Sequence, residues 1–205
     1  MNSDNIIFID LDGPILEGKE RHYGCYKDII QQGGGTPIPL DQYWELKRNM
    51  VKRDRILELS GYQLSYNEFF DAWIAKIEQR TYLALDKLKP GALQTLTKWA
   101  DDYKLVLVTL RQSREELIYQ LNVLGIVHLF DEILCCDYRM KNSKYHAIKH
   151  KEYQRGLFIG DSEEDMCTAS LLKIPFYAIV TGLRDPKYLH ADRYYNEIQE
   201  IDIPF

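Results

Sequence analysis

The sequence predicts an α/β fold, with a doubly wound parallel sheet and a small helical domain inserted into it. Three observations support this prediction. Short apolar runs recur along the chain, helical patterns separate the later runs, and a long interval after the first run has helical patterns without a convincing strand. Apolar runs that are continuous rather than alternating are typical of strands buried on both faces of a parallel sheet.

Five apolar runs are predicted strands, and each is followed by a polar residue or a glycine. The runs cover residues 6–9, 105–108, 133–136, 157–159 and 176–180. The residues that follow them are Asp10, Thr109, Asp137, Gly160 and Thr181. Because strands alternate with helices in this part of the chain, we expect a doubly wound sheet.

Helices are predicted between the later strands from the spacing of their apolar residues. Ser113 and Glu116 have the spacing of a capping box, which marks the start of one of these helices. The residues expected on the buried faces are Leu93, Leu96, Trp99 and Ala100, then Leu117, Leu121 and Leu124, and finally Met166, Ala169 and Leu172.

The interval from residue 12 to residue 105 is much longer than the roughly dozen residues that a crossover between parallel strands needs. Ser65 and Glu68 form a second potential capping box inside it. Its apolar residues at helical spacing are Tyr43, Leu46, Met50 and Leu57, followed by Phe69, Phe70, Trp73, Ile74 and Ile77. We therefore expect an α/β core domain over residues 1–14 and 87–205, and a helical domain over residues 15–86.

Composition and charge narrow the choice of partners and compartment. The net charge is −5, with 26 basic and 31 acidic residues, which argues against a protein that coats a nucleic-acid polymer. No apolar run approaches the ~20 residues of a membrane span, and residues 1–5 lack the pattern of a secretory signal. The four cysteines match no zinc or disulfide framework, so we expect reduced thiols in a cytoplasmic protein.

Acidic residues gather where the predicted strands end. Asp10 and Asp12 follow the first strand, and Asp161 and Asp165 follow the fourth. Ligands of open parallel sheets bind beyond the carboxyl ends of the strands, so these side chains are expected at one edge. Clustered carboxylates repel one another unless a cation lies between them, and Mg²⁺ accepts carboxylate and phosphate oxygens as ligands. Acidic residues in the first turn of a helix are the simpler alternative for Asp161 and Asp165.

Four sequence elements resemble the motifs of the haloacid dehalogenase superfamily, whose members are mostly phosphohydrolases. They are Asp10-Leu11-Asp12-Gly13 after a strand, Thr109 at a strand end, Lys144, and Gly160-Asp161-Ser162-Glu163-Glu164-Asp165. The resemblance spans about residues 6–190 and implies a Rossmann-like core, and the helical insert resembles a cap that closes over the active site. One departure is Pro14, where the family commonly has threonine.

The resemblance implies a Mg²⁺-dependent phosphatase acting on a small phosphorylated metabolite. Asp10 would be the nucleophile that forms an aspartyl-phosphate, and Asp12 would protonate the leaving oxygen and then activate water. Thr109 and Lys144 would complete the catalytic set by holding the phosphoryl oxygens. The implied metal-binding residues are Asp10, Asp12 through its backbone carbonyl, Asp161 and, in a supporting position, Asp165. The implied substrate-binding residues are Leu11, Thr109, Leu110, Arg111 and Lys144.

Several alternatives stay open at this point. Lys141 is a second candidate for the phosphate-binding lysine, and Arg111 is alternatively a surface residue. A phosphomutase would keep every motif, a phosphonate hydrolase would need an amine from Lys19 or Lys47, and a non-catalytic binding protein would keep the fold alone. The basic residues of the insert are candidates for substrate contact: Arg21, His22, Lys47, Arg48, Lys52, Arg53 and Arg55. The cluster from Lys47 to Arg55 is alternatively a solvated helix face, and His22 an ordinary polar side chain.

Overall fold

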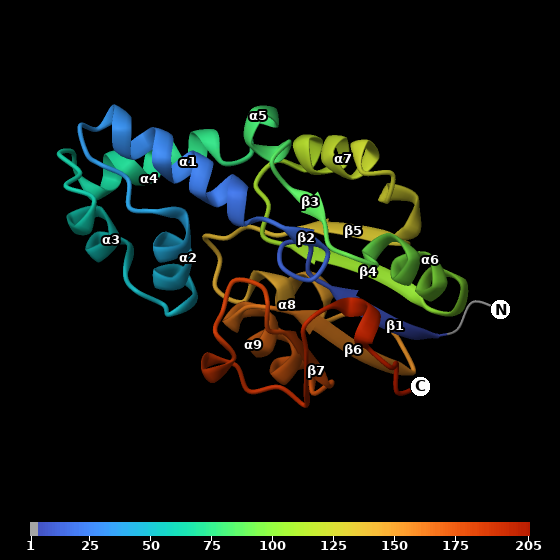
Figure 1. The fold of residues 1–205 in the computed structure, drawn as a ribbon. Coiled ribbons are helices and arrows are strands. Elements are labelled where there is room, and N and C mark those ends of the chain that lie inside the picture. The colour runs from blue at the N-terminus through green and yellow to red at the C-terminus, as the bar shows by residue number, and fades with distance from the viewer. Residues whose placement is uncertain (1–3) are drawn as a thin grey trace. The chain divides into compact units, whose positions relative to one another are not determined.

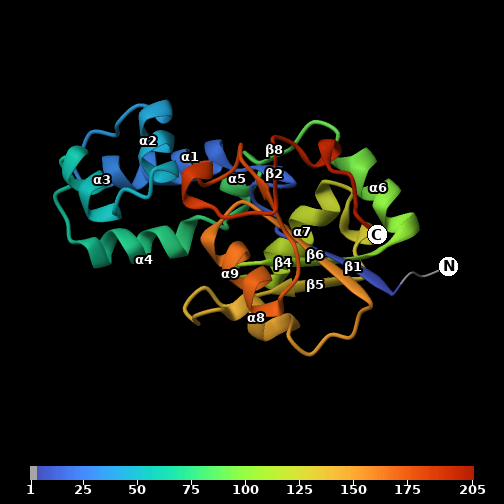
Figure 2. The ribbon, with the colours of Figure 1, turned by 90° about the horizontal axis from the view of Figure 1, so that it is seen from below.

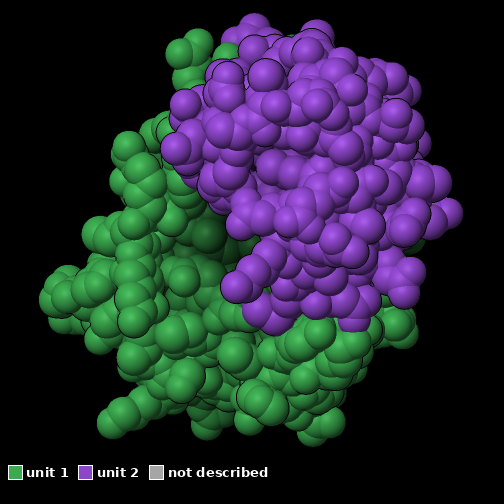
Figure 3. All heavy atoms as spheres, turned by 90° about the vertical axis from the view of Figure 1, so that its left-hand side faces the viewer, with its two compact units in different colours: residues 1–17, 88–205 green, residues 18–87 purple. Residues whose placement is uncertain are grey.

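The computed structural model describes residues 4–205. The chain divides into two compact units, one formed by Met1–Glu17 with Leu88–Phe205 and the other by Gly18–Lys87 (Figure 3). They are called the α/β unit and the helical unit below. The expectation drawn from residues 1–5 falls mainly on residues 1–3, which lie outside the described part of the chain.

The α/β unit is built on one six-stranded sheet in which all neighbouring strands are parallel. Its strands are β1 (Asn5–Ile9), β4 (Lys104–Thr109), β5 (Glu132–Cys135), β6 (Arg155–Gly160), β7 (Phe176–Ile179) and β8 (Arg193–Tyr195), in the spatial order β5-β4-β1-β6-β7-β8. The predicted doubly wound α/β fold is confirmed. The edge strand β8 is not among the predicted strands, because its Arg-Tyr-Tyr sequence has no apolar run and its first two residues are exposed.

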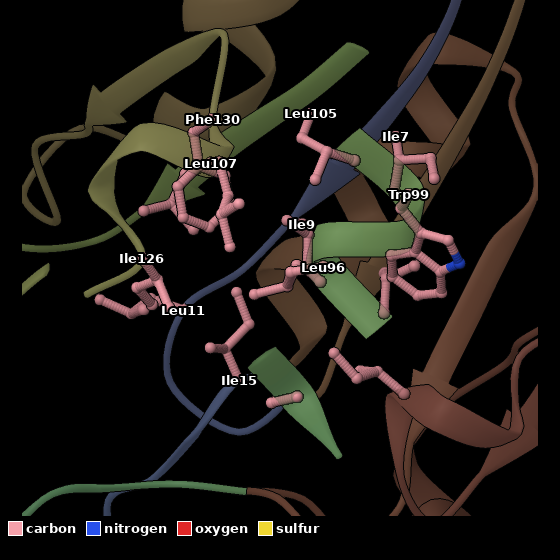
Figure 4. Close-up of a cluster of buried hydrophobic side chains, with 14 of the residues drawn as sticks. Ile7, Ile9, Leu11, Ile15, Leu96, Trp99, Leu105, Leu107, Ile126 and Phe130 are labelled. Atoms are coloured by element: carbon pink, nitrogen blue, oxygen red, sulfur yellow. The ribbon is translucent and has the colours of Figure 1, made fainter. Parts of the chain in front are cut away.

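Helices cover both faces of this sheet (Figure 1). They are α6 (Ala92–Asp102) and α7 (Arg114–Val123) on one face, and α8 (Ser143–Ile148) and α9 (Glu163–Leu172) on the other. Successive residues of β1 point to opposite faces. Ile7 and Ile9 pack in the cluster with α6 and α7 (Figure 4), whereas Ile6 and Phe8 pack with α8 and α9. Figure 2 shows α8 and α9 side by side.

In the α/β unit, α7 starts as predicted, whereas the buried face of α6 differs from the predicted one. Ser113 caps α7 as expected, since its hydroxyl accepts a hydrogen bond from the Glu116 N–H. Leu93, in contrast, is wrong as a core residue, because 40% of its surface is exposed. The buried stripe of α6 begins at Ala92 and continues through Leu96 and Trp99, at spacings of four and three residues. Leu93 lies one position past the start of that stripe and so faces solvent.

The helical unit has a core of its own. Its helices are α1 (Lys19–Gln32), α2 (Leu40–Arg48), α3 (Arg53–Leu59), α4 (Tyr66–Lys76) and α5 (Arg80–Leu83). The rings of Tyr26 and Tyr43 stack in that core with centroids 4.2 Å apart. The predicted capping box of Ser65 and Glu68 starts α4. Met50 is wrong as a core residue, because α2 ends before it and its φ of 56° is not helical. The residues expected on one helical face therefore belong to two helices, α2 and α3.

Two short strands, β2 (Leu16–Glu17) and β3 (Lys87–Leu88), pair with each other in a separate sheet. They lie in the interval for which the sequence predicted no strand. Two residues are too few to give a recognisable apolar pattern, so these strands could not be predicted. They lie where the chain leaves the α/β unit and where it returns. All four cysteines are free thiols. Within residues 4–205, no helix combines the length and apolar composition that crossing a bilayer requires.

Candidate active site

The carboxyl ends of β4, β1 and β6 bring the predicted site residues to one edge of the sheet. The central strand β1 has β4 and β6 as its neighbours, so the direction in which the sheet is wound changes at β1. Asp10 follows β1 directly, and its N–H donates to the carbonyl of Ile159 at 3.0 Å. Thr109 is the last residue of β4, and Asp161 follows β6. Crevices at such a point are the usual ligand sites of open α/β sheets.

Three carboxylates form a buried cluster at this edge. One oxygen each from Asp10, Asp161 and Asp165 lies within 4.8 Å of the others, and all three residues are buried. The carboxylate of Asp12 is not part of this cluster. Three of the four acidic residues predicted at this edge therefore meet, because the strands that precede them, β1 and β6, are neighbours.

Asp161 is held between two glycine backbones. A Cβ atom at Gly13 would lie 1.9 Å from Asp161 Oδ2, and one at Gly182 would lie 2.1 Å from the same atom. Only a residue without a side chain leaves room for the carboxylate there. The Leu183 N–H also donates to Oδ2. Gly182 and Leu183 follow β7 and were not predicted as site residues, although the run ending at Thr181 pointed to the same edge.

Both carboxylate oxygens of Asp165 accept hydrogen bonds from other groups of the protein. Its Oδ1 accepts from Lys144, and its Oδ2 accepts from the N–H groups of Asp161 and Ser162 and from the Ser162 hydroxyl. Ser162 and Asp165 thereby form the capping box that starts α9. Asp165 thus serves both the helix start, as the simpler alternative held, and the orientation of Lys144.

Lys144 lies in the first turn of α8, and its Nζ is 2.9 Å from Asp10 Oδ2 and 2.6 Å from Asp165 Oδ1. Its side chain is only 1% exposed. Burial opposes its charge, but the two carboxylates outweigh burial and raise the pKa of Lys144 above its ordinary value. Lys141 is exposed in the turn before α8. Of these two lysines, only Lys144 meets the carboxylate cluster.

Burial strongly affects the acids of the cluster. It raises the pKa of Asp10 from 3.8 to about 7, with Lys144 opposing the shift and neighbouring carboxylates reinforcing it. Burial likewise raises the pKa of Asp161 well above its ordinary value, and the charge of Asp10 adds to this. Both shifts have the same cause: negative charge is concentrated away from water with one ammonium to balance it.

The residues present fit a hard divalent cation. The cluster has three carboxylates and one ammonium, so bringing all three acids to their charged form leaves an excess of negative charge. Carboxylate oxygens are the ligands that Mg²⁺ prefers in proteins. Asp165 accepts four hydrogen bonds, three of them at Oδ2, whereas each oxygen of Asp10 has one partner, so Asp10 and Asp161 are the better candidates to hold the ion directly.

The remaining predicted residues have different surroundings. Leu11 is buried and its N–H donates to Asp10 Oδ1 at 2.7 Å, and Leu110 packs against the core on the α8 and α9 face. Thr109 is buried at the end of β4, and its carbonyl accepts a hydrogen bond from the Cys136 N–H at 2.8 Å. Arg111 is not a surface residue, because its buried side chain forms an ion pair with Asp12.

Within the helical unit, the basic residues fall into separate environments. Arg21 is buried in an ion pair with Asp86 at 2.9 Å, which favours a structural role. Lys47 lies 2.5 Å from His22 Nδ1 and 5.4 Å from the centre of the Trp73 ring. Lys52 and Arg55, in contrast, are exposed, as a solvated helix face requires.

Comparisons with known proteins agree with this architecture. The sequence family described as haloacid dehalogenase-like hydrolase matches residues 6–179. A protein from Haemophilus somnus predicted to be a phosphoglycolate phosphatase is 18% identical, covers 95% of each chain and has a TM-score of 0.74. A protein from Thermotoga maritima assigned as a β-phosphoglucomutase is 18% identical, with a TM-score of 0.68 over 96% of this chain and 95% of that one.

A third similar structure is that of YfnB from Bacillus subtilis, a protein of the same superfamily solved bound to magnesium. It is 15% identical, covers 98% of this chain and 97% of its own, and has a TM-score of 0.67. No curated protein sequence matches the chain. The family match spans most of the chain, including the strands that carry Asp10, Thr109 and Asp161. This chain belongs to the haloacid dehalogenase-like hydrolase family.

Proposed function

We propose that the protein is a Mg²⁺-dependent phosphatase of small phosphorylated metabolites, acting through an aspartyl-phosphate on Asp10. The observation that carries this proposal is the contact of Lys144 with Asp10, 2.9 Å apart and beside Asp161 at the carboxyl edge of the sheet. A carboxylate nucleophile next to a fixed cation suits attack on an anionic phosphate, because the cation reduces charge repulsion. The names of similar structures, a phosphatase among them, support the same substrate class.

The residues divide the reaction between them. Asp10 attacks phosphorus while Asp12 gives a proton to the leaving oxygen, and Asp12 then takes a proton from the water that hydrolyses the intermediate. Thr109 and Lys144 hold phosphoryl oxygens, and the Leu11 and Leu110 segments line the substrate position. Asp10, Asp161 and the Asp12 carbonyl would hold Mg²⁺, with Asp165 supporting them. The bound ion would neutralise phosphate charge and align the reacting oxygens.

Two further assignments belong to this proposal. The helical residues 15–86 are proposed as a cap that takes part in substrate selection, by analogy with the family's inserts. A cytoplasmic location is supported by four free cysteines, which fit a reducing compartment. The proposed partner is a small phosphorylated metabolite rather than a nucleic acid or a membrane.

A phosphomutase is the second candidate, because a similar structure from Thermotoga maritima is assigned to that activity. Mutase and phosphatase share the phosphorylated aspartate and differ in what accepts the phosphoryl group. Incubation with a sugar phosphate and detection of both free phosphate and isomerised sugar phosphate separates the two.

The proposal is tested with p-nitrophenyl phosphate and a panel of phosphorylated sugars, nucleotides and organic acids. We expect phosphate release that requires Mg²⁺, stops with EDTA and is abolished in Asp10→Asn. Circular dichroism verifies that this variant is folded. Unchanged turnover in Asp10→Asn would exclude Asp10 as the nucleophile.

A further inference from the structure

Arg111 donates two hydrogen bonds to the carboxylate of Asp12. Its Nε donates to Asp12 Oδ2 and its Nη2 donates to Asp12 Oδ1, each at 2.8 Å. The two residues are 99 positions apart in the sequence, so the tertiary fold creates the contact. The parallel arrangement is the bidentate geometry in which guanidinium and carboxylate groups fit each other best.

Arg111 is itself fixed from several directions. Its side chain is 3% exposed, whereas that of Asp12 is 29% exposed. Nη2 also donates to Oε1 of Gln120, a buried residue of α7, at 3.3 Å. The carbonyl of Arg111 accepts a hydrogen bond from the thiol of Cys135 at the end of β5. The guanidinium is therefore bound to the buried core of the α/β unit, and Asp12 is the more exposed partner of the pair.

The bidentate contact of Arg111 with Asp12 has a chemical consequence. A partly exposed aspartate otherwise samples several rotamers, whereas two parallel hydrogen bonds fix both the direction and the plane of its carboxylate. A lysine supplies the same charge at one point but cannot fix the plane. Positioning of a reacting group on this scale has large effects, since a displacement of about 1 Å can lower a rate about 100-fold.

We propose that Arg111 is the residue that positions Asp12 for proton transfer, rather than a ligand of the substrate. This inference rests on the proposed phosphatase function. In the first step the Asp10 oxygen bonds to phosphorus, the bond to the leaving oxygen breaks, and Asp12 delivers its proton to that oxygen. In the second, water bonds to phosphorus, the bond to Asp10 breaks, and the water proton returns to Asp12.

Arg111 acts on both steps through the orientation of Asp12. The second step depends on it most when p-nitrophenyl phosphate is the substrate, because the acidic p-nitrophenol leaves with little help from a proton donor. Misplacing Asp12 then slows release of phosphate from Asp10 more than its transfer to Asp10. A residue that only bound substrate would instead raise KM when lost, since its loss weakens binding in the ground and transition states alike.

The test compares Arg111→Lys and Arg111→Gln with the wild type on p-nitrophenyl phosphate. We expect kcat to fall about 10- to 100-fold and KM to fall with it, because slow hydrolysis of phosphorylated Asp10 limits turnover while its formation changes little. Stopped-flow traces should show a burst of nearly one p-nitrophenol per enzyme, because the phosphorylated Asp10 accumulates. Mass spectrometry of acid-quenched protein detects that species directly. Arg114→Lys, three positions along the chain and bonded to the carbonyl of Ile133, is the matched control and should leave kcat unchanged.

A double variant tests whether Arg111 acts through Asp12. In an Asp12→Asn background, Arg111→Lys should change the remaining rate by less than about twofold, because coupled residues are not additive. A raised KM with unchanged kcat, or equal effects of Arg111→Lys in both backgrounds, would overturn the inference while leaving the phosphatase function in place. A wild-type protein with no Mg²⁺-dependent phosphatase activity would overturn both. Thermal unfolding of each variant ensures that the rates compare folded proteins.

Discussion

Lys144 donates a hydrogen bond to Asp165 across 2.6 Å, and both side chains are almost fully removed from solvent. The same ammonium lies 2.9 Å from Asp10. Asp165 also belongs to the capping box in which Ser162 caps α9, so the start of one helix holds the lysine of another in contact with the proposed nucleophile. Structural and chemical roles are thus combined in one buried network.

Replacing Lys144 should therefore affect both stability and activity. In Lys144→Met, the carboxylates of Asp10 and Asp165 lose their buried positive partner, and breaking a buried ion pair in this way costs about 3–5 kcal/mol. We expect urea unfolding to show a loss of this size and phosphate release to disappear. Lys141→Met, at an exposed position, should change neither measurement. Activity that is lost in Lys141→Met and kept in Lys144→Met would reverse the assignment.

Gly13 should not tolerate a side chain, because of its contact with Asp161. In Gly13→Ala the new Cβ would lie 1.9 Å from Asp161 Oδ2, so the carboxylate must move. We expect weaker Mg²⁺ binding, measured by isothermal titration calorimetry, together with a loss of stability.

The control for Gly13 is Gly125→Ala. Both glycines have positive φ, 98° and 72°, but a Cβ at Gly125 meets no atom within 4 Å. Both variants therefore carry the backbone strain of about 1–2 kcal/mol, and only Gly13→Ala carries the clash. Equal Mg²⁺ affinity in the two variants would refute a role for Gly13 in holding Asp161.

Mg²⁺ binding should strengthen as pH rises through about 7. Burial raises the pKa of Asp10 to about 7 from 3.8, so the metal-free protein keeps this proton up to neutral pH. The proton stabilises the folded state below pH 3.8, and this contribution is lost as pH rises towards 7. Binding of a cation must displace the proton. Calorimetry should give an affinity about tenfold weaker at pH 6 than at pH 8, and Asp10→Asn should flatten the difference. Equal affinities at the two pH values would contradict this account.

The ion pair of Arg21 and Asp86 should stabilise the helical unit without taking part in turnover. Its atoms are 2.9 Å apart, and both side chains are buried. Arg21→Met leaves Asp86 as an unpaired buried charge, and we expect a loss of about 3–5 kcal/mol in urea unfolding. The double variant Arg21→Met/Asp86→Leu removes both charges and should recover most of this loss. A double variant as unstable as the single one would show that the missing charge is not the cause.

The fold could be predicted because buried parallel strands leave continuous apolar runs in the sequence. Strands buried on both faces, such as β1, need a continuous apolar run, and each run ended near the strand end that the structure has. β8 lacked the signal because it is an edge strand with exposed residues. Met50 was misplaced because apolar spacing does not reveal where a helix ends, and α2 ends before it. Leu93 was misplaced because it lies one position past Ala92, beside the buried stripe of α6.

The sequence by itself determined the α/β class, five of the six strands of the main sheet and which acidic residues follow them, because burial and chain direction leave a local pattern. Only the tertiary structure decided which groups meet at the site. The Leu183 N–H reaches Asp161 from 22 residues away, and Arg111 reaches Asp12 from 99 residues away. Such contacts depend on how strands and helices pack, and no local pattern records them. Packing therefore decided that Arg111 pairs with Asp12.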